Sequence, residues 1–126
     1  MIESQTALDF FVTPDMSDDE HKVWNVLRFR EGPASAIQVE AVAELVGIPA
    51  RRVQQIVRTL IHERGRAIGT SMAEPYGWFL AVTHEQREAV ADLHRRRALA
   101  ELSTAAKILG IDRREVVRRF QTELDA

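Results

Sequence analysis

The sequence predicts a mostly helical fold with one small β-hairpin, in the α+β class. Three observations lead to this class: two apolar helical patterns meet at a short break, two strand-like segments follow around a loop, and two further helical patterns complete the chain. The helices around the break and the hairpin form one expected domain, residues 17–82. We expect an N-terminal arm at residues 1–16 and a helical extension at residues 83–126.

The first predicted helix runs from about Asp18 to Arg30. Ser17 and Glu20 have the spacing of a capping box, and the acidic residues after Ser17 suit the positive end of a helix dipole. The apolar members are Val23, Trp24, Val26 and Leu27, with Phe29 as a further candidate.

Residues 34–37 follow a break at Gly32-Pro33 and allow two interpretations. Ser35 and Gln38 have the spacing of a capping box. Alternatively, these residues form a short strand that gives the hairpin a third partner, and the next helix begins near Gln38. We favour the strand.

Two apolar helices meet at Gly47-Ile48-Pro49. The apolar positions are Val39, Val42, Ala43 and Val46 in the first, and Val53, Ile56, Val57, Leu60 and Ile61 in the second. Gly47 is expected to end the first helix, and Pro49 to lie in the first turn of the second. The second helix is expected to end near Arg64-Gly65.

The outward face of this second helix carries guanidinium and amide groups. The residues between its apolar positions are Arg51, Arg52, Gln54, Gln55 and Arg58. Arg51, Gln55, Arg58 and His62 share one stripe of the helix. Arginine pairs with guanine or phosphate, and glutamine pairs with adenine, so this face matches what duplex DNA presents. The net charge is −6 over residues 1–46, +3 over 47–79 and +1 over 80–126, so the basic excess falls on this region.

The hairpin is predicted from Arg66–Ser71 and Gly77–Val82, with a tip at residues 72–76. Arg66, Thr70 and Ser71 are candidates to touch the DNA backbone or minor groove. Trp78, Phe79 and Leu80 are expected to pack the hairpin onto the preceding helix, Phe79 and Leu80 above all. Strand alternation requires one of the two aromatic residues to face away from the core.

The extension contains a long helix, from Thr83 or His84 to Leu109, and a last helix from Arg113 to about Leu124. Thr83 with Gln86 and Asp112 with Glu115 have capping-box spacing, and Gly110 separates the helices. The stripe on the long helix has the 3-4-3 spacing of a helix–helix seam. We therefore expect a homodimer interface made of Leu99, Leu102, Ala106, Leu109 and Phe120. The run Arg95-Arg96-Arg97 is interpreted as a solvated face, with DNA backbone or a neighbouring chain as the alternative.

Composition excludes several classes of protein. The chain has 126 residues, a net charge of −2 and no cysteine, which excludes disulfides and thiolate metal sites. It has no apolar run long enough to span a membrane and no visible signal peptide, so a cytoplasmic location is expected. The four histidines match no metal-ligand spacing, and no glycine-rich phosphate loop is present. We expect no enzyme activity, no metal and no cofactor.

Several segments resemble those of winged-helix DNA-binding domains. They are Ala36-Ile37, residues 43–48, Val53 with Ile56, residues 68–71, residues 77–81, Thr83 with Glu85, and residues 96–98. More narrowly, the chain is similar to small winged-helix proteins of phages and bacterial mobile elements, over roughly residues 20–110. It departs from them at Gln38 and Pro49, where such domains often have Ser or Thr, and at His84, which replaces a frequent Pro.

The resemblance implies binding of double-stranded DNA, most simply as a dimeric transcriptional regulator. Two alternatives are a winged-helix protein–protein interaction module and a phage or plasmid replication-type DNA-binding protein. The arginines on the second helix favour DNA, because a protein-docking surface would favour apolar or mixed residues there.

Overall fold

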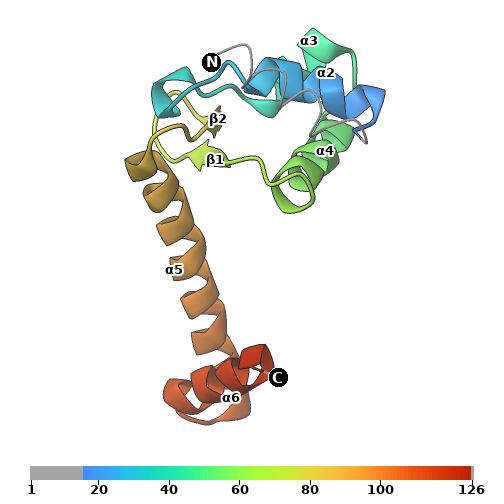
Figure 1. The fold of residues 1–126 in the computed structure, drawn as a ribbon. Coiled ribbons are helices and arrows are strands. Elements are labelled where there is room, and N and C mark those ends of the chain that lie inside the picture. Colours follow the sequence, from blue (N-terminus) through green and yellow to red (C-terminus); the bar gives the residue numbers. More distant parts are fainter. Residues whose placement is uncertain (1–15, 126) are drawn as a thin grey trace. The chain divides into compact units, whose positions relative to one another are not determined.

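The computed structural model describes residues 16–125, so the expected N-terminal arm lies outside the described residues except for Met16. The chain divides into two compact units, the first ending at Arg87 and the second beginning at Glu88. The elements are α2 (Asp18–Leu27), a 3-10 turn (Pro33–Ser35), α3 (Val39–Val46), α4 (Ala50–His62), β1 (Ile68–Ser71), β2 (Gly77–Leu80), α5 (His84–Leu109) and α6 (Arg113–Asp125) (Figure 1). The predicted α+β composition, mostly helical with one antiparallel pair of strands, is confirmed.

Helix α2 begins where the sequence predicts and ends earlier. The Ser17 hydroxyl accepts a hydrogen bond from the backbone N–H of Glu20 at 3.2 Å, which is the capping contact expected. The helix stops at Leu27 instead of Arg30 because the following backbone bonds to the hairpin: Leu80 N–H donates to Arg30 O at 2.7 Å. Phe29 is therefore an exposed residue and not a member of the core.

The strand favoured at residues 34–37 is wrong, because Pro33–Ser35 forms a 3-10 turn. The third partner of the hairpin is nevertheless present. Ile37 forms a single antiparallel bridge with Trp78, with two backbone N–H···O bonds of 2.8 and 2.9 Å. Helix α3 then begins at Val39, directly after Gln38, as expected for that interpretation.

The break between α3 and α4 follows the predicted turn. Gly47 ends α3 in the left-handed conformation, at φ 71°, and its N–H donates to Ala43 O at 2.9 Å. Pro49 lies one position before the first turn of α4. Helix α4 ends at His62, two or three residues earlier than predicted, because the chain turns and Arg66 N–H donates to Leu60 O.

One apolar cluster holds α2, α3, α4 and the hairpin together. Its fully buried members are Val23, Leu27, Val42, Val53, Ile56 and Leu60. Trp78 and Leu80 pack against this cluster from β2. Phe79 is buried but lies outside it, on the opposite face of the strand, so the expectation that Phe79 joins the hairpin to α4 is wrong. Because successive side chains of a strand point to opposite faces, Phe79 is the aromatic residue that faces away from this cluster.

Both helices of the extension are capped near the predicted residues. The Thr83 hydroxyl accepts from Gln86 N–H at 3.0 Å, and the Gln86 amide oxygen accepts from Thr83 N–H at 3.3 Å, so the whole box is formed. At α6 only half of the box is found, because Asp112 accepts from Arg114 N–H at 2.7 Å while Glu115 bonds forward along the helix. No helix within residues 16–125 has the length and apolar character needed to cross a membrane.

Candidate nucleic-acid interface

Helix α4 has one buried face and one exposed face. The buried residues are Val53, Ile56, Val57 and Leu60. The exposed residues are Arg51, Arg52, Gln54, Gln55, Arg58 and His62. The predicted division of this helix into a core face and a polar face is therefore confirmed. The apolar face fixes the orientation of the helix, and the polar face is presented to solvent.

Three arginines on this face are free to bind a ligand. Among residues 16–125, Arg51, Arg52 and Arg58 have no ion-pair or hydrogen-bond partner for their side chains. A free guanidinium offers several N–H donors in a planar fork, which suits phosphate or the guanine edge. We call Arg51, Arg52, Gln54, Gln55 and Arg58 the α4 polar face below.

The other two arginines of residues 47–79 are withdrawn into the protein. Arg64 pairs with Glu20 of α2, with 3.1 Å between Nε and the carboxylate oxygen. Arg66 lies over the buried Trp24 ring, with its guanidinium carbon 4.8 Å from the ring centroid and with Nε and Nη2 buried. Arg66 is thus placed as a packing residue at the end of α4, away from the exposed face on which a backbone contact was expected.

Ser71 is buried, whereas Thr70 is exposed. Ser71 is 8% exposed, and its hydroxyl donates to Ala73 O at 2.7 Å and lies 3.4 Å from Ala73 N. This hydroxyl is engaged in the turn of the hairpin. Of the three residues predicted to touch DNA from the hairpin region, Thr70 is exposed, Arg66 is half-buried and Ser71 is buried.

We expect Ser71→Ala to leave DNA affinity unchanged and to lower the free energy of unfolding by about 1 kcal/mol, the usual net value of one hydrogen bond. Thr70→Ala is the matched control, because it removes an exposed hydroxyl one residue away. Urea denaturation and DNA titration of both variants measure the two effects. A larger loss of DNA affinity for Ser71→Ala than for Thr70→Ala would contradict this placement.

The hairpin tip has a chemistry that the sequence reasoning missed. Between Ala67 and Leu80 the single charged residue is Glu74, so the hairpin offers no cation to a phosphate. Met72 and Tyr76 are exposed there. The tip is therefore an apolar surface with one negative charge.

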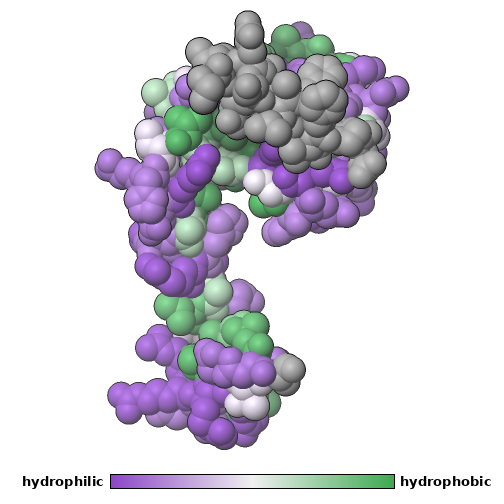
Figure 2. Space-filling view, in the orientation of Figure 1, coloured by the Kyte–Doolittle hydropathy of each residue, from purple (hydrophilic) through white to green (hydrophobic). Residues whose placement is uncertain are grey.

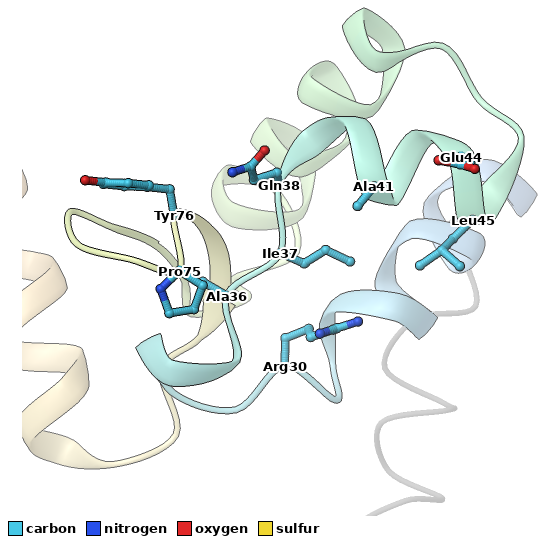
Figure 3. Close-up of a pocket in the computed structure, with 9 residues that line it drawn as sticks. All are labelled: Arg30, Ala36, Ile37, Gln38, Ala41, Glu44, Leu45, Pro75 and Tyr76. Atoms are coloured by element: carbon cyan, nitrogen blue, oxygen red, sulfur yellow. The ribbon is translucent and has the colours of Figure 1, made fainter.

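A pocket of about 540 Å³ lies between this tip and α3 (Figure 3). It is lined by Arg30, Ala36, Ile37, Gln38, Ala41, Glu44, Leu45, Pro75 and Tyr76. Leu45 is 64% exposed and Tyr76 is 51% exposed, so the apolar lining is open to solvent. The sequence signal was Leu45 itself, an apolar residue outside the buried stripe of α3.

No metal centre is found in the described part of the chain. Within residues 16–125, no three His, Cys, Asp or Glu side chains are grouped so that they could hold an ion. The polar residues that line the pocket at the tip are Arg30, Gln38, Glu44 and Tyr76, and no histidine, serine or cysteine lines it.

The second unit, described by itself, exposes most of the predicted dimer residues. Leu99, Leu109 and Phe120 are exposed, and Leu102 is half-buried. Ala106 is 4% exposed in this chain, so of the five residues it has the least surface to offer to a partner. The backbone oxygen of Ala106 accepts a hydrogen bond from Ile111 N–H at 3.1 Å, across the turn at Gly110.

An ion-pair cluster lies along α6 and makes a pH-dependent contribution to the stability of the folded chain. Hydrogen bonds from Arg118, at 2.6 Å, and from Arg119, at 3.3 Å, lower the pKa of Glu115 from 4.5 to about 2. Because the pKa is depressed in the folded chain, the stabilisation is complete above about pH 4.5 and is lost as the pH falls towards 2.

We expect the Glu115 carboxyl carbon to titrate by NMR with a midpoint near pH 2. In Arg118→Gln, which removes the stronger hydrogen bond, the midpoint should rise towards the ordinary value. Equal midpoints in the two proteins would mean that Arg118 does not hold the carboxylate in solution.

Compared with known protein-family models, with curated proteins and with solved structures, the chain shows no match.

Proposed function

We propose that this chain is a winged-helix protein that binds double-stranded DNA through the α4 polar face, as a dimeric regulator of transcription. The observation that carries the proposal is that Arg51, Arg52 and Arg58 are exposed and unpartnered beside two glutamines, on a helix whose opposite face is buried. The element order also supports it, because α2, α3, the turn, α4 and a hairpin follow one another as in winged-helix domains. The role is binding, not catalysis.

In this proposal α4 lies in the major groove, which is wide enough to admit a helix. Arg51, Gln54, Gln55 and Arg58 contact base edges or fix the register, and Arg52 adds a phosphate contact. Thr70 is the one hairpin residue retained from the predicted set. Arg66 and Ser71 are omitted because their polar groups face the protein interior and the hairpin turn.

The number of free arginines limits the affinity of one copy. If each of three arginines neutralises one phosphate, the plot of log affinity against log salt has a slope of about −3 for one copy and about −5 for two. One copy is then a weak binder at physiological salt, whereas two copies reach the slope of a modest specific regulator. This is the reason for including a dimer in the proposal.

The test is binding of the full chain to random-sequence duplex DNA across a salt series, followed by selection of the bound sequences. A steep loss of affinity with salt and one enriched palindromic motif are expected for a dimeric regulator. Salt-dependent binding without any motif would favour the replication-type alternative. Absence of binding even at low salt would overturn DNA binding altogether.

One observation favours a second candidate function, docking of another protein. The open pocket has the exposed apolar groups of Leu45 and Tyr76 together with the charged residues Arg30 and Glu44, and this mixed lining is suited to a segment of another protein. Its lining comes from α3, with Ala41 and Leu45, and from the hairpin tip, with Pro75 and Tyr76 (Figure 3). Leu45→Gln distinguishes the two candidate functions. It should weaken the binding of a protein partner and leave DNA affinity unchanged.

A further inference from the structure

The pocket between the hairpin tip and α3 has the form of an open groove. In Figure 3, Pro75 and Tyr76 lie on its hairpin side, and Ala41 and Leu45 lie on its α3 side. Ile37 lies between the two sides and is buried, so it belongs to the floor, whereas Leu45 is 64% exposed and Tyr76 is 51% exposed. Figure 2 shows hydrophobic residues, in green, at the surface over α3. Sites for small molecules bury most of the ligand, so a groove this exposed is better suited to a chain segment that lies across it.

The length of the groove sets the size of such a segment. Its α3 side runs from Gln38 to Leu45, which is about 10 Å of helix at 1.5 Å per residue. An extended chain rises about 3.3 Å per residue, so about three residues of a segment lie along this side. One large apolar side chain among them can contact both Leu45 and the floor at Ile37.

The two sides of the groove carry negative charge. Helix α3 has the exposed residues Glu40 and Glu44 and no basic residue, and Glu74 is the single charged residue of the tip. Within residues 16–125, these three carboxylates have no ion-pair partner. Arg30, the single cation among the lining residues, is half-buried. Because opposite charges favour association and like charges oppose it, the groove favours a basic segment over the phosphates of DNA.

Charge and polarity also separate another protein from two parts of this chain. Residues 1–15 contain three acidic and no basic residues, so they would bring like charge to the groove. The α4 polar face of a second copy would bring arginines, but its exposed residues include no apolar side chain to contact Leu45. Neither part combines the two required properties, which favours a segment of another protein.

We infer that this groove binds a short extended segment of another protein, in which one large apolar side chain stands beside a lysine or an arginine. The apolar side chain contacts Leu45 and Ile37, and the cation lies next to Glu44. The inference rests on the second candidate function and deepens it by naming the chemistry of the ligand. It does not depend on DNA binding, because the groove and the α4 polar face share no residue.

The test begins with selection from a phage-displayed library of random short peptides on the immobilised full chain. We expect enriched peptides with an aromatic or aliphatic residue next to a basic one. The enriched peptide, labelled with fluorescein, is then titrated with the chain and followed by fluorescence anisotropy. Leu45→Gln should raise the dissociation constant on the order of tenfold or more, as for an anchor contact of an interface. Ile108→Gln is the control, because Ile108 is 80% exposed but does not line the groove.

The role of charge is tested by a second pair of variants. Glu44→Gln should raise the dissociation constant about two- to fivefold at low salt, the usual effect of one exposed ion pair. The effect should be smaller at high salt, because dissolved ions screen exposed charges. Glu63→Gln is the matched control, since Glu63 is an exposed carboxylate at the end of α4 that does not line the groove.

Four results would overturn the inference: no enriched peptide, enriched peptides without a basic residue, equal binding by the Leu45 and Ile108 variants, or equal binding by the Glu44 and Glu63 variants. Sedimentation of Leu45→Gln tests the remaining occupant, because a loss of self-association would assign the groove to a second copy and would also overturn the inference. DNA titration separates the proposals. A chain that binds the peptide but no DNA overturns only DNA binding, and a chain that binds DNA but fails the peptide tests overturns only this inference.

Discussion

Arg51→Ala and Arg58→Ala are each expected to weaken binding to the selected duplex by about 1–3 kcal/mol, which is roughly five- to 150-fold. Both side chains are exposed on α4, and neither has a partner within residues 16–125 that would compete with DNA. Removing either one therefore removes a ligand contact without disturbing an internal one. The measurement is a titration of each variant against the selected sequence and against substituted sequences.

The pattern of loss distinguishes the two possible roles of each arginine. A residue that reads a base should relax the preference at one position of the site, and a residue that binds phosphate should weaken all sequences alike and reduce the salt slope by about 1. Lys107→Ala is the control, because it removes an exposed positive charge from the end of α5. Lys107→Ala should retain the affinity and salt slope of the unmodified chain. If both arginine variants also retain them, α4 is not the helix that contacts DNA.

Gly77→Ala is expected to lower the free energy of unfolding by about 2–6 kcal/mol, since backbone strain and overpacking each contribute about 1–3 kcal/mol. Gly77 has φ +125°, and an added Cβ would lie 2.2 Å from the carbonyl oxygen of Ile37 and 2.7 Å from Gln38 N. These are backbone atoms, so no side chain can rotate away. The single bridge between Ile37 and Trp78 must open to relieve the contact.

Gly65→Ala is the matched control for this prediction. Gly65 also has a positive φ, +67°, but nothing lies within 4 Å of its added Cβ. Gly65→Ala should therefore lower the free energy of unfolding only by the backbone strain, on the order of 1 kcal/mol. Urea denaturation of the two variants gives the difference between them, which isolates the contact with Ile37. Equal losses of stability would mean that the segment before α3 does not approach the hairpin this closely in solution.

The faces of the helices were predictable from the sequence because burial follows local periodicity. Val53, Ile56 and Leu60 are spaced so that any core contacting one of them also contacts the others. The turn at Gly47 was predictable for the same local reason, since glycine readily adopts a positive φ.

The ends of the elements and the state of single polar residues were not predictable in this way. Helix α2 ends early because of hydrogen bonds to Leu80, which is remote in sequence. Arg66 is held by Trp24, and the order of residues gives no sign that these two side chains meet. Ser71 is buried and Thr70 is exposed because the chain turns back at Ala73, whose backbone oxygen accepts a hydrogen bond from the Ser71 hydroxyl.

The positions of the two tryptophans have a practical consequence. Trp24 and Trp78 both lie in the first unit, and the chain has no other tryptophan. Tryptophan fluorescence therefore follows the unfolding of the first unit alone, whereas far-ultraviolet circular dichroism also follows α5 and α6. Two transitions that do not coincide would show that the units unfold separately, and dilution should then move only the dichroism curve if the second unit is held by another copy.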